Sequence, residues 1–447
     1  MRSISMVFGL YVSNKIGSEA VGTFSLVMSV YLFFVTITTS GIGLACTCIV
    51  SEQFANSNFV NGLKAVKSCI LFSLLLGLGC SCIVLIFSNT ISSIWLKSVI
   101  SSKPIFLISV GLPFISVSSV INGYFSAVRK AYKSAISQSF ELFIKIILTI
   151  ILLNFYQNKS VESVCNCLIL ADVISEICSF TLIFILYKRD SIKYTKRAIL
   201  GITFKRNIFR IAFPVSATSC IRSGLSTLKQ FIIPSRLMLF GLTYSMALSE
   251  YGKINGMSMA LLTFPTVFIM SFSNLLIPEF TSLAAKQYKK RILDICKKVF
   301  NATSLFSISL CIIFFFLADK ISLLVFQNLE CSKYIKILSP IILFIYTDNI
   351  LDSMLKGLNK QFSVMTCNII DLILTISILY FTLPTLGITG YLLSIMVSEI
   401  FNFSVSYYQL YKATGFMPTA SIVCCYLFFA TCGLYNLFPY ISINMSC

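Results

Sequence analysis

The sequence lacks histidine altogether, has few charged residues and contains a single tryptophan among 447 residues. Without histidine, the chain has neither the commonest metal ligand nor the side chain that most often serves as a general base near neutral pH. Charged residues make up 11% of the chain, compared with about 25% in an average soluble domain. Apolar residues make up 57%, and the mean hydropathy is +0.89. This composition argues against a water-soluble enzyme.

Acidic residues are also scarce, because 16 Asp and Glu stand against 35 Lys and Arg, which gives a net charge of +19. Such an excess occurs in nucleic-acid-binding proteins. Here, however, the basic residues lie mostly between long apolar runs, as they do in cytoplasmic loops of membrane proteins. We therefore expect membrane lipids and no nucleic acid around the chain. The 17 cysteines show neither a disulfide framework nor a zinc spacing, so no metal and no other cofactor is expected.

Apolar runs long enough to cross a bilayer, which takes about 20 residues, fill most of the chain. A first run at 3–12 is too short to span at roughly 1.5 Å per residue. The longer runs lie at 22–49, 65–88, 104–127, 136–154, 164–187, 208–234, 257–278, 300–327, 337–355, 364–383, 387–410 and 418–437. The sequence thus predicts an all-α integral membrane protein with about 13 transmembrane segments, the first one short.

Basic residues concentrate in every second connection between these runs, around 129–133, 188–206 and 286–298. By the positive-inside rule these connections are cytoplasmic, which places the N-terminus in the cytoplasm. The longest one divides the chain into halves. The predicted organisation is an N-terminal six-helix bundle at 1–190, a basic cytoplasmic linker at 191–206, a C-terminal six-helix bundle at 207–412, and an extra transmembrane segment and tail at 413–447.

The two halves look like copies of each other. Lys130 in a basic turn and Glu141 in the following helix recur as Lys360 and Asp371, each 230 positions later (360 − 130 and 371 − 141). A Ser-Glu-Ile tripeptide also recurs in the helix after each acid. Parallel repeats of this kind bind substrate between the halves, near the middle of the membrane. Within its own helix, Glu141 is expected to pair with Lys145.

Charges inside the apolar runs are candidate functional residues, because a charge at the bilayer centre costs at least about 2.5 kcal/mol. Arg222 and Lys229 lie seven residues apart in the run 208–234 and hence on one helix face. We interpret them as a cationic wall of a substrate cavity, although snorkelling to an interface is the alternative. Pro214 and Pro265 predict kinks or hinges within the membrane.

Acidic residues inside the runs come in pairs. Asp172 and Glu176 are four residues apart, as are Asp348 and Asp352, so each pair lies on one helix face. Two acids on one face repel each other when both are ionised, which favours the binding of a proton or a sodium ion. We interpret these pairs as candidate ion-coupling sites. Alternatively, they neutralise Lys and Arg of neighbouring helices.

Three stretches resemble a known family. They are Ile16-Gly-Ser-Glu-Ala-Val-Gly22, Ala247-Leu-Ser-Glu-Tyr-Gly-Lys-Ile-Asn-Gly-Met257 and Leu276-Ile-Pro-Glu279. This pattern resembles the stage V sporulation protein B family of the multidrug/oligosaccharidyl-lipid/polysaccharide (MOP) exporter superfamily. The resemblance implies two six-helix bundles that form a V around a central cavity, which opens alternately to either side. Relatives include flippases of lipid II and of other undecaprenyl-linked sugars.

We therefore expect a flippase of the cell membrane that exports an anionic undecaprenyl-linked saccharide, such as a peptidoglycan precursor, in cell-wall or spore-cortex synthesis. Arg222 and Lys229 suit its diphosphate, since Arg can bind phosphate in a bidentate way. The alternative is a drug/cation antiporter of the same superfamily (MATE type), which would carry acids on the leading helix of each half. A membrane-embedded glycosyltransferase or polymerase would need an external catalytic domain, whereas the loops here are short and basic.

Overall fold

The computed structural model describes residues 2–55, 58–95, 102–155, 160–195 and 205–418, with a few positions between 425 and 431. The described residues are nearly all helical and include no strand, which confirms the predicted all-α fold class. The first half contains α1 (Arg2–Ile16), α2 (Ser18–Thr39), α3 (Ile42–Ala55), α4 (Phe59–Ile86), α5 (Ser88–Trp95), α6 (Lys103–Ala127), α7 (Ala131–Phe155) and α8 (Val161–Thr195). The remainder contains α9 (Lys205–Leu239), α10 (Tyr244–Tyr251), the π-helix η1 (Gly252–Ser258), α11 (Met259–Thr263), α12 (Thr266–Ala285), α13 (Lys289–Phe316), α14 (Ala318–Phe326), α15 (Glu330–Leu338), α16 (Ile341–Gly357), α17 (Gln361–Leu386) and α18 (Ile388–Thr414).

Nine stretches of the described chain are long and apolar enough to cross a membrane, and a tenth forms if α15 and α16, which meet at 53°, count as one span. The chain is thus a multi-pass membrane protein. The predicted segment at 208–234 is helical within α9 but is not among these spans, because its middle is rich in Ser and Thr and carries Arg222. The predicted segment at 418–437 lies almost entirely outside the described residues.

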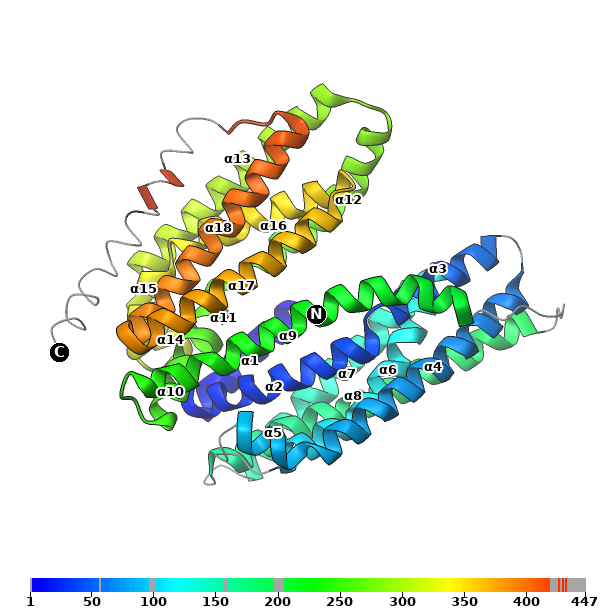
Figure 1. Cartoon of the computed structure of the whole chain (residues 1–447), viewed down its shortest axis with the longest axis horizontal. Coiled ribbons are helices and arrows are strands. Elements are labelled where there is room, and N and C mark those ends of the chain that lie inside the picture. The colour runs from blue at the N-terminus through cyan, green and yellow to red at the C-terminus, as the bar shows by residue number, and fades with distance from the viewer. Residues whose placement is uncertain are drawn as a thin grey trace. The chain divides into compact units, whose positions relative to one another are not determined.

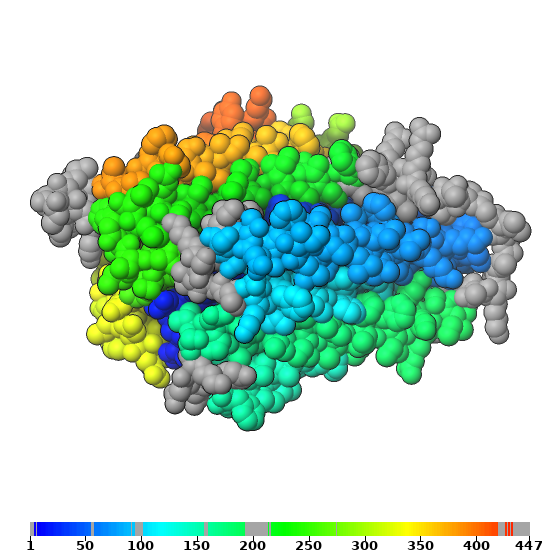
Figure 2. Space-filling model, turned by 60° about the horizontal axis from the view of Figure 1, so that its bottom comes forward, coloured from blue at the N-terminus to red at the C-terminus, as the bar shows by residue number. Residues whose placement is uncertain are grey.

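The outside of the helices is apolar, as expected for a protein dissolved in lipid. On α4, which lies at the surface in Figure 2, Leu71, Leu75 and Ile86 are 57%, 61% and 74% exposed. The opposite face of α4 is buried against α6 and α3, where Cys69 and Val66 have no exposed surface. In water, such an exposed leucine face would promote association. In a bilayer it contacts the acyl chains.

The chain forms two compact units, which we call unit 1 (Thr23–Thr227) and unit 2 (Arg2–Gly22 together with Leu228 onward). In unit 1, α4, α6 and α8 pack together, and α7 packs on α8; in unit 2, α16 packs against α12, α13 and α18 (Figure 1). Both α2 and α9 therefore begin in one unit and end in the other. The predicted linker at 191–206 lies mostly outside the described residues, and its first and last residues belong to α8 and α9. The predicted division of the chain at that linker stays a prediction.

Within unit 1, the first part of α9 lies antiparallel along α2. The Ser216 hydroxyl donates to the carbonyl of Ser40 at 2.5 Å, and the Thr227 hydroxyl donates to the carbonyl of Ser29 at 3.1 Å. From the first contact to the second, the position on α9 rises by 11 residues (216 to 227) while that on α2 falls by 11 (40 to 29), so the two helices run antiparallel. Hydroxyl-rich contacts of this kind are typical of helices packed in a membrane. They hold the Ser- and Thr-rich part of α9 beside α2.

The internal repeat is visible in the turns that follow α6 and α16. Arg129 and Asn359 both adopt left-handed backbone conformations, with φ values of 58° and 60°. The next amide in each turn donates to a carbonyl five residues earlier, from Lys130 to Phe125 at 2.8 Å and from Lys360 to Leu355 at 2.9 Å. These positions differ by 230, the offset that the sequence indicates. The repeat at the basic turns is therefore confirmed.

A buried aspartate anchors the turn between α6 and α7. Asp190, whose side chain is 1% exposed, forms ion pairs with Lys130 at 2.7 Å and Lys133 at 2.8 Å. The Tyr124 hydroxyl also donates to its carboxylate, at 3.0 Å. Three donors on one buried carboxylate satisfy its hydrogen-bonding capacity and tie the end of α8 to the basic turn. No residue in the corresponding part of α18 is acidic, so the two repeats differ here.

Replacing Asp190 by asparagine should destabilise unit 1, because it leaves two lysines facing each other without their shared anion. We expect a loss of about 3 kcal/mol, at the lower end for a buried pair, since both lysines can reach water. Thermal unfolding in detergent measures it. Asp319→Asn is the matched control, because Asp319 and Lys336 form an exposed pair. Equal unfolding temperatures of both variants would contradict a structural role of Asp190.

Candidate substrate and coupling sites

Arg222 and Lys229 occupy α9 on the two sides of the boundary between the units. Arg222 belongs to unit 1, is exposed, and forms no ion pair with any described residue. Lys229 belongs to unit 2 and is half-buried. The negative charges of Asp371 and Glu399 attract its ammonium group. The two cations therefore differ in surroundings, although their spacing places them on the same face of one helix. Of the two cations, Arg222 is the one without an acidic partner among the described residues.

The acids of α8 have separate partners. Asp172 forms an ion pair with Lys145 of α7 at 2.5 Å. The prediction that Lys145 forms an ion pair with Glu141 of its own helix is wrong. Lys145 instead reaches across to α8 and pairs with Asp172. Glu176, one turn further along α8, accepts a hydrogen bond from the Tyr31 hydroxyl of α2 through Oε1. Its buried Oε2 has no partner among the described residues.

A polar cavity of about 390 Å³ opens beside Glu176 within unit 1. Among the side chains that line it are Glu141, Glu176, Asn122 and Gln138, together with the hydroxyls of Ser137 and Ser179. The amide oxygen of Asn122 is buried and, like Oε2 of Glu176, lacks a hydrogen-bond donor in the described chain. Its described lining holds two carboxylates and this amide oxygen but no Lys or Arg, a set of side chains whose chemistry suits a cation or a proton.

Unit 2 has a second group of buried acids, on α16, α17 and α18. Asp352 pairs with Lys356 at 3.7 Å and accepts a hydrogen bond from Ser406 at 3.4 Å. Asp348 is 9% exposed, and its Oδ1 has no hydrogen-bond donor in the described part of the chain. In both acid pairs that the sequence indicates, one member thus has a lysine partner and the other has none within the described ranges. Asp371 accepts a hydrogen bond from Ser398 at 2.7 Å.

The two prolines interrupt helices differently. Pro265 separates α11, which ends at Thr263, from α12, which begins at Thr266, so the predicted segment 257–278 is broken there. Pro214 lies inside α9, where the backbone remains helical.

Several site residues could not be identified in the sequence. Tyr31 and Asn122 lie in ordinary apolar runs, so only the fold brings them to Glu176 and its cavity. For Glu141 the sequence did contain an indication of a role, because the second half has an acid, Asp371, at the equivalent position of the repeat. The spacing within its helix favoured a structural pair, whereas Glu141 lines the cavity.

The fold is that of MOP-superfamily transporters. The chain matches an inward-facing structure of a multidrug resistance MATE family transporter with a TM-score of 0.69 at 14% identity, covering 92% of this chain and 94% of that one. An outward-facing structure of such a transporter gives a TM-score of 0.67 at 12% identity, with 91% of each chain covered. At these identities the likeness concerns the fold alone.

The family model of polysaccharide biosynthesis proteins matches residues 1–284, and the chain belongs to that family. It is 24% identical to stage V sporulation protein B of Bacillus subtilis (strain 168) over 408 residues, which cover 89% of this chain and 78% of the relative. It is 20% identical to sporulation protein YkvU of the same organism over 307 residues, covering 68% and 69%. The resemblance inferred from the motifs is confirmed.

Proposed function

We propose that this protein is a flippase, not an enzyme, which exports an anionic undecaprenyl-linked saccharide by alternating access. Membership of the polysaccharide biosynthesis family supports a saccharide substrate. The two relatives are sporulation proteins, which supports a peptidoglycan-type precursor in cell-wall or spore-cortex synthesis. The membrane is then the cell membrane, with the N-terminus in the cytoplasm.

The observation that carries the proposal is Arg222, a cation in a membrane protein without an acidic partner among the described residues. An unpaired guanidinium within a membrane is costly unless it reaches water or binds an anion. A diphosphate supplies that anion, because its oxygens match the planar donors of Arg. We propose that Lys229 adds a second positive charge, shared with Asp371 and Glu399.

A binding experiment tests this assignment without requiring transport. Native mass spectrometry of the purified protein compares an undecaprenyl diphosphate-linked disaccharide with the same disaccharide on undecaprenol. We expect the diphosphate lipid to be retained preferentially and Arg222→Ala to lose the preference. Equal retention of both lipids would remove the diphosphate from the proposal.

For coupling, we propose that protons or sodium ions bind at the acids that lack a lysine partner in the described chain, Glu176 in unit 1 and Asp348 in unit 2. Their buried oxygens without hydrogen-bond donors support this role. Asp172 and Asp352, whose charges are shared with lysines, then tune the neighbouring acid. We propose Pro214 and Pro265 as the hinge positions of the cycle.

Glu176→Gln should remove the response of transport to the coupling gradient, because glutamine keeps the shape but cannot bind a proton or a sodium ion as a carboxylate does. Vesicles with either a pH gradient or a sodium gradient measure the response and identify the ion. Glu162→Gln, in the first turn of the same helix, is the control. An unchanged gradient dependence of the Glu176 variant would leave that acid a structural role only.

A drug/cation antiporter is the second candidate, and the acid-lined cavity of unit 1 favours it. A solved structure described as "Reverse polarity of binding pocket suggests different function of a MOP superfamily transporter from Pyrococcus furiosus Vc1 (DSM3638)" gives a TM-score of 0.60 at 13% identity, covering 91% of this chain and 94% of that one. Pocket polarity is thus a criterion for distinguishing members of this fold. Arg222, which has no ion pair within the described ranges, favours the anionic substrate.

A further inference from the structure

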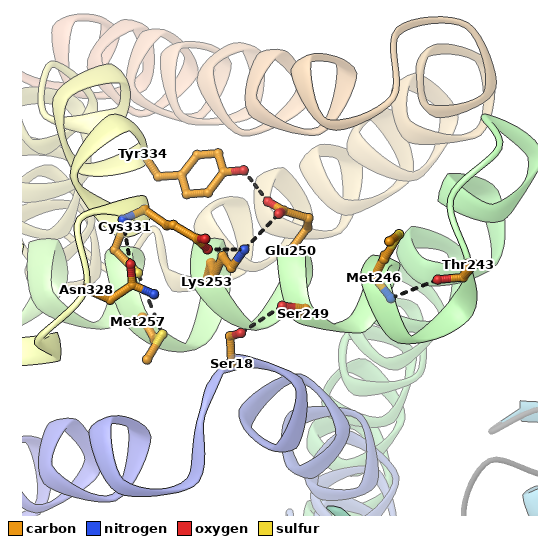
Figure 3. Close-up of polar contacts among 11 residues, drawn as sticks. Ser18, Thr243, Met246, Ser249, Glu250, Lys253, Met257, Asn328, Cys331 and Tyr334 are labelled. Carbon is orange, nitrogen blue, oxygen red and sulfur yellow. Dashed lines mark hydrogen bonds and ion pairs between the residues drawn. The ribbon is translucent and has the colours of Figure 1, made fainter.

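The π-helix η1 and the adjoining α10 contact two other parts of unit 2, α15 on one side and the start of α2 on another. One side carries a group of polar side chains that joins η1 and α10 to α15 (Figure 3). Lys253 forms ion pairs with Glu250 at 2.9 Å and with Glu330 of α15 at 2.5 Å. The hydroxyl of Tyr334, also on α15, donates to Glu250. We call these four residues the polar clasp.

The clasp joins segments that are far apart in the sequence, and its cation is well covered. The side chain of Lys253 is 12% exposed and that of Glu250 is 16% exposed, whereas that of Glu330 is 57% exposed. Lys253 therefore depends on the two carboxylates for most of its solvation. Glu330 can exchange its lysine for water at little cost, because it already reaches the surface. The bond between Lys253 and Glu330 is thus the weakest part of the clasp.

A second side of the same segment packs on the first turns of α2, directly after α1, and we call Ser18–Gly22 the α1–α2 joint. The hydroxyls of Ser18 and Ser249 are 2.7 Å apart. A Cβ atom added at Gly252 would lie 1.9 Å from the carbonyl oxygen of Ser18, and one added at Gly22 would lie 2.2 Å from that of Leu248. The two backbones are therefore in direct contact, which only glycine permits.

The residues of the clasp and of the joint alternate along the chain. Ser249 and Gly252 contact the joint, while Glu250 and Lys253, each one position later, reach α15. Because neighbouring residues of a helix are fixed relative to one another, the segment cannot turn away from the joint without pulling Lys253 from Glu330. The π-helical turn, a rare form that is frequent at functional sites, lies where this rotation would take place.

We propose that the polar clasp is a latch on the α1–α2 joint: while Lys253 bridges Glu250 and Glu330, η1 stays docked on Ser18 and Gly22, and its release lets that end of unit 2 open. This device concerns how the protein moves and does not depend on which substrate it carries. The latch is electrostatic, so its strength depends on the positive charge of residue 253 and not only on the length of its side chain.

Cysteine labelling tests the latch and needs no substrate. Ser249→Cys is introduced into the protein in lipid vesicles, and its reaction with a membrane-impermeant maleimide is followed by mass spectrometry. Adding Lys253→Met should speed the labelling about tenfold, since loss of a partly covered ion pair shifts the closed state by that order. Lys253→Arg keeps the charge and should label at the rate of native Lys253. Glu330→Gln removes only the exposed one of the two ion pairs, so it should speed the labelling in the same direction but less than Lys253→Met does.

Native Cys296 of α13, which has no exposed surface, distinguishes a latch from a general stabiliser of the fold. Its labelling should stay slow in every variant. The proposal is overturned if neither Lys253→Met nor Glu330→Gln speeds labelling of the thiol introduced by Ser249→Cys, or if labelling of Cys296 rises by the same factor. Because no transport is measured, failure of the lipid-export proposal would leave these results unaffected.

Discussion

Replacing Arg222 by alanine is expected to reduce transport of an undecaprenyl diphosphate-linked saccharide about a hundredfold or more. Removing one partner of a desolvated charge pair costs about 2–5 kcal/mol, and about 2.7 kcal/mol corresponds to a hundredfold. The protein should remain folded, since Arg222 is exposed and has no ion-pair partner among the described residues. Proteoliposomes with a fluorescent lipid-linked saccharide measure the rate.

Arg236→Ala is the matched control for that experiment. Arg236 lies near the end of the same helix, and its guanidinium stacks over the ring of Tyr380, 3.4 Å from the centroid. Because this cation already has a partner, its loss should leave the transport rate within a few-fold of native. Native transport by Arg222→Ala would remove the central residue of the proposed substrate site.

Gly252→Leu should have the largest effect on the fold. The added Cβ would lie 1.9 Å from the carbonyl oxygen of Ser18 and 2.9 Å from the backbone nitrogen of Gly22. Backbone atoms cannot move aside as a flexible side chain can, so the α1–α2 joint must separate. Overpacking of this kind costs about 3 kcal/mol or more. Thermal unfolding of the purified protein in detergent should show a markedly lower midpoint.

Gly79→Ala provides the comparison, because a Cβ at that position of α4 would have no heavy atom within 4 Å apart from the neighbouring residues and backbone of its own helix. Its midpoint should be unchanged or slightly raised, since alanine favours helix over glycine. If Gly252→Leu unfolds at the native temperature, the close contact between the joint and η1 does not exist in the protein.

Hydrophobic length and charge predicted most of the fold. Runs of apolar residues identify membrane helices because the bilayer sets their length. The repeat was recognisable because the basic turn and the following acid must keep their spacing in both copies, as Lys130 and Lys360 do. The break of the helix at Pro265 could also be predicted from the sequence, since proline removes a backbone hydrogen bond.

The pairing of charges could not be predicted in the same way. A spacing of four places Asp172 and Glu176 on one face but does not say which cation of a neighbouring helix approaches which acid. Lys145 is as close in sequence to Glu141 as helical pairing requires, yet it bonds to Asp172. Which carboxylate remains without a lysine is decided by packing between helices, and periodicity within one helix carries no information about it.

The contacts made by the stretch 247–257 could not be predicted either, because they too join segments that are distant in the sequence. This stretch contributed to the family resemblance, but no sequence pattern indicates that Lys253 bridges to Glu330, 77 positions later (330 − 253). Gly22 and Gly252 were a usable signal, because small residues in membrane helices indicate close packing. Which two segments meet there is known only from the fold.

The most direct test of the account is transport by the purified native protein in proteoliposomes, offered two substrates side by side. One is a fluorescent undecaprenyl diphosphate-linked disaccharide, and the other is a lipophilic organic cation dye. The account predicts that the lipid-linked saccharide crosses the bilayer in a protein-dependent way and that the dye does not. Export of the dye without movement of the lipid would contradict it and establish the cation antiporter instead.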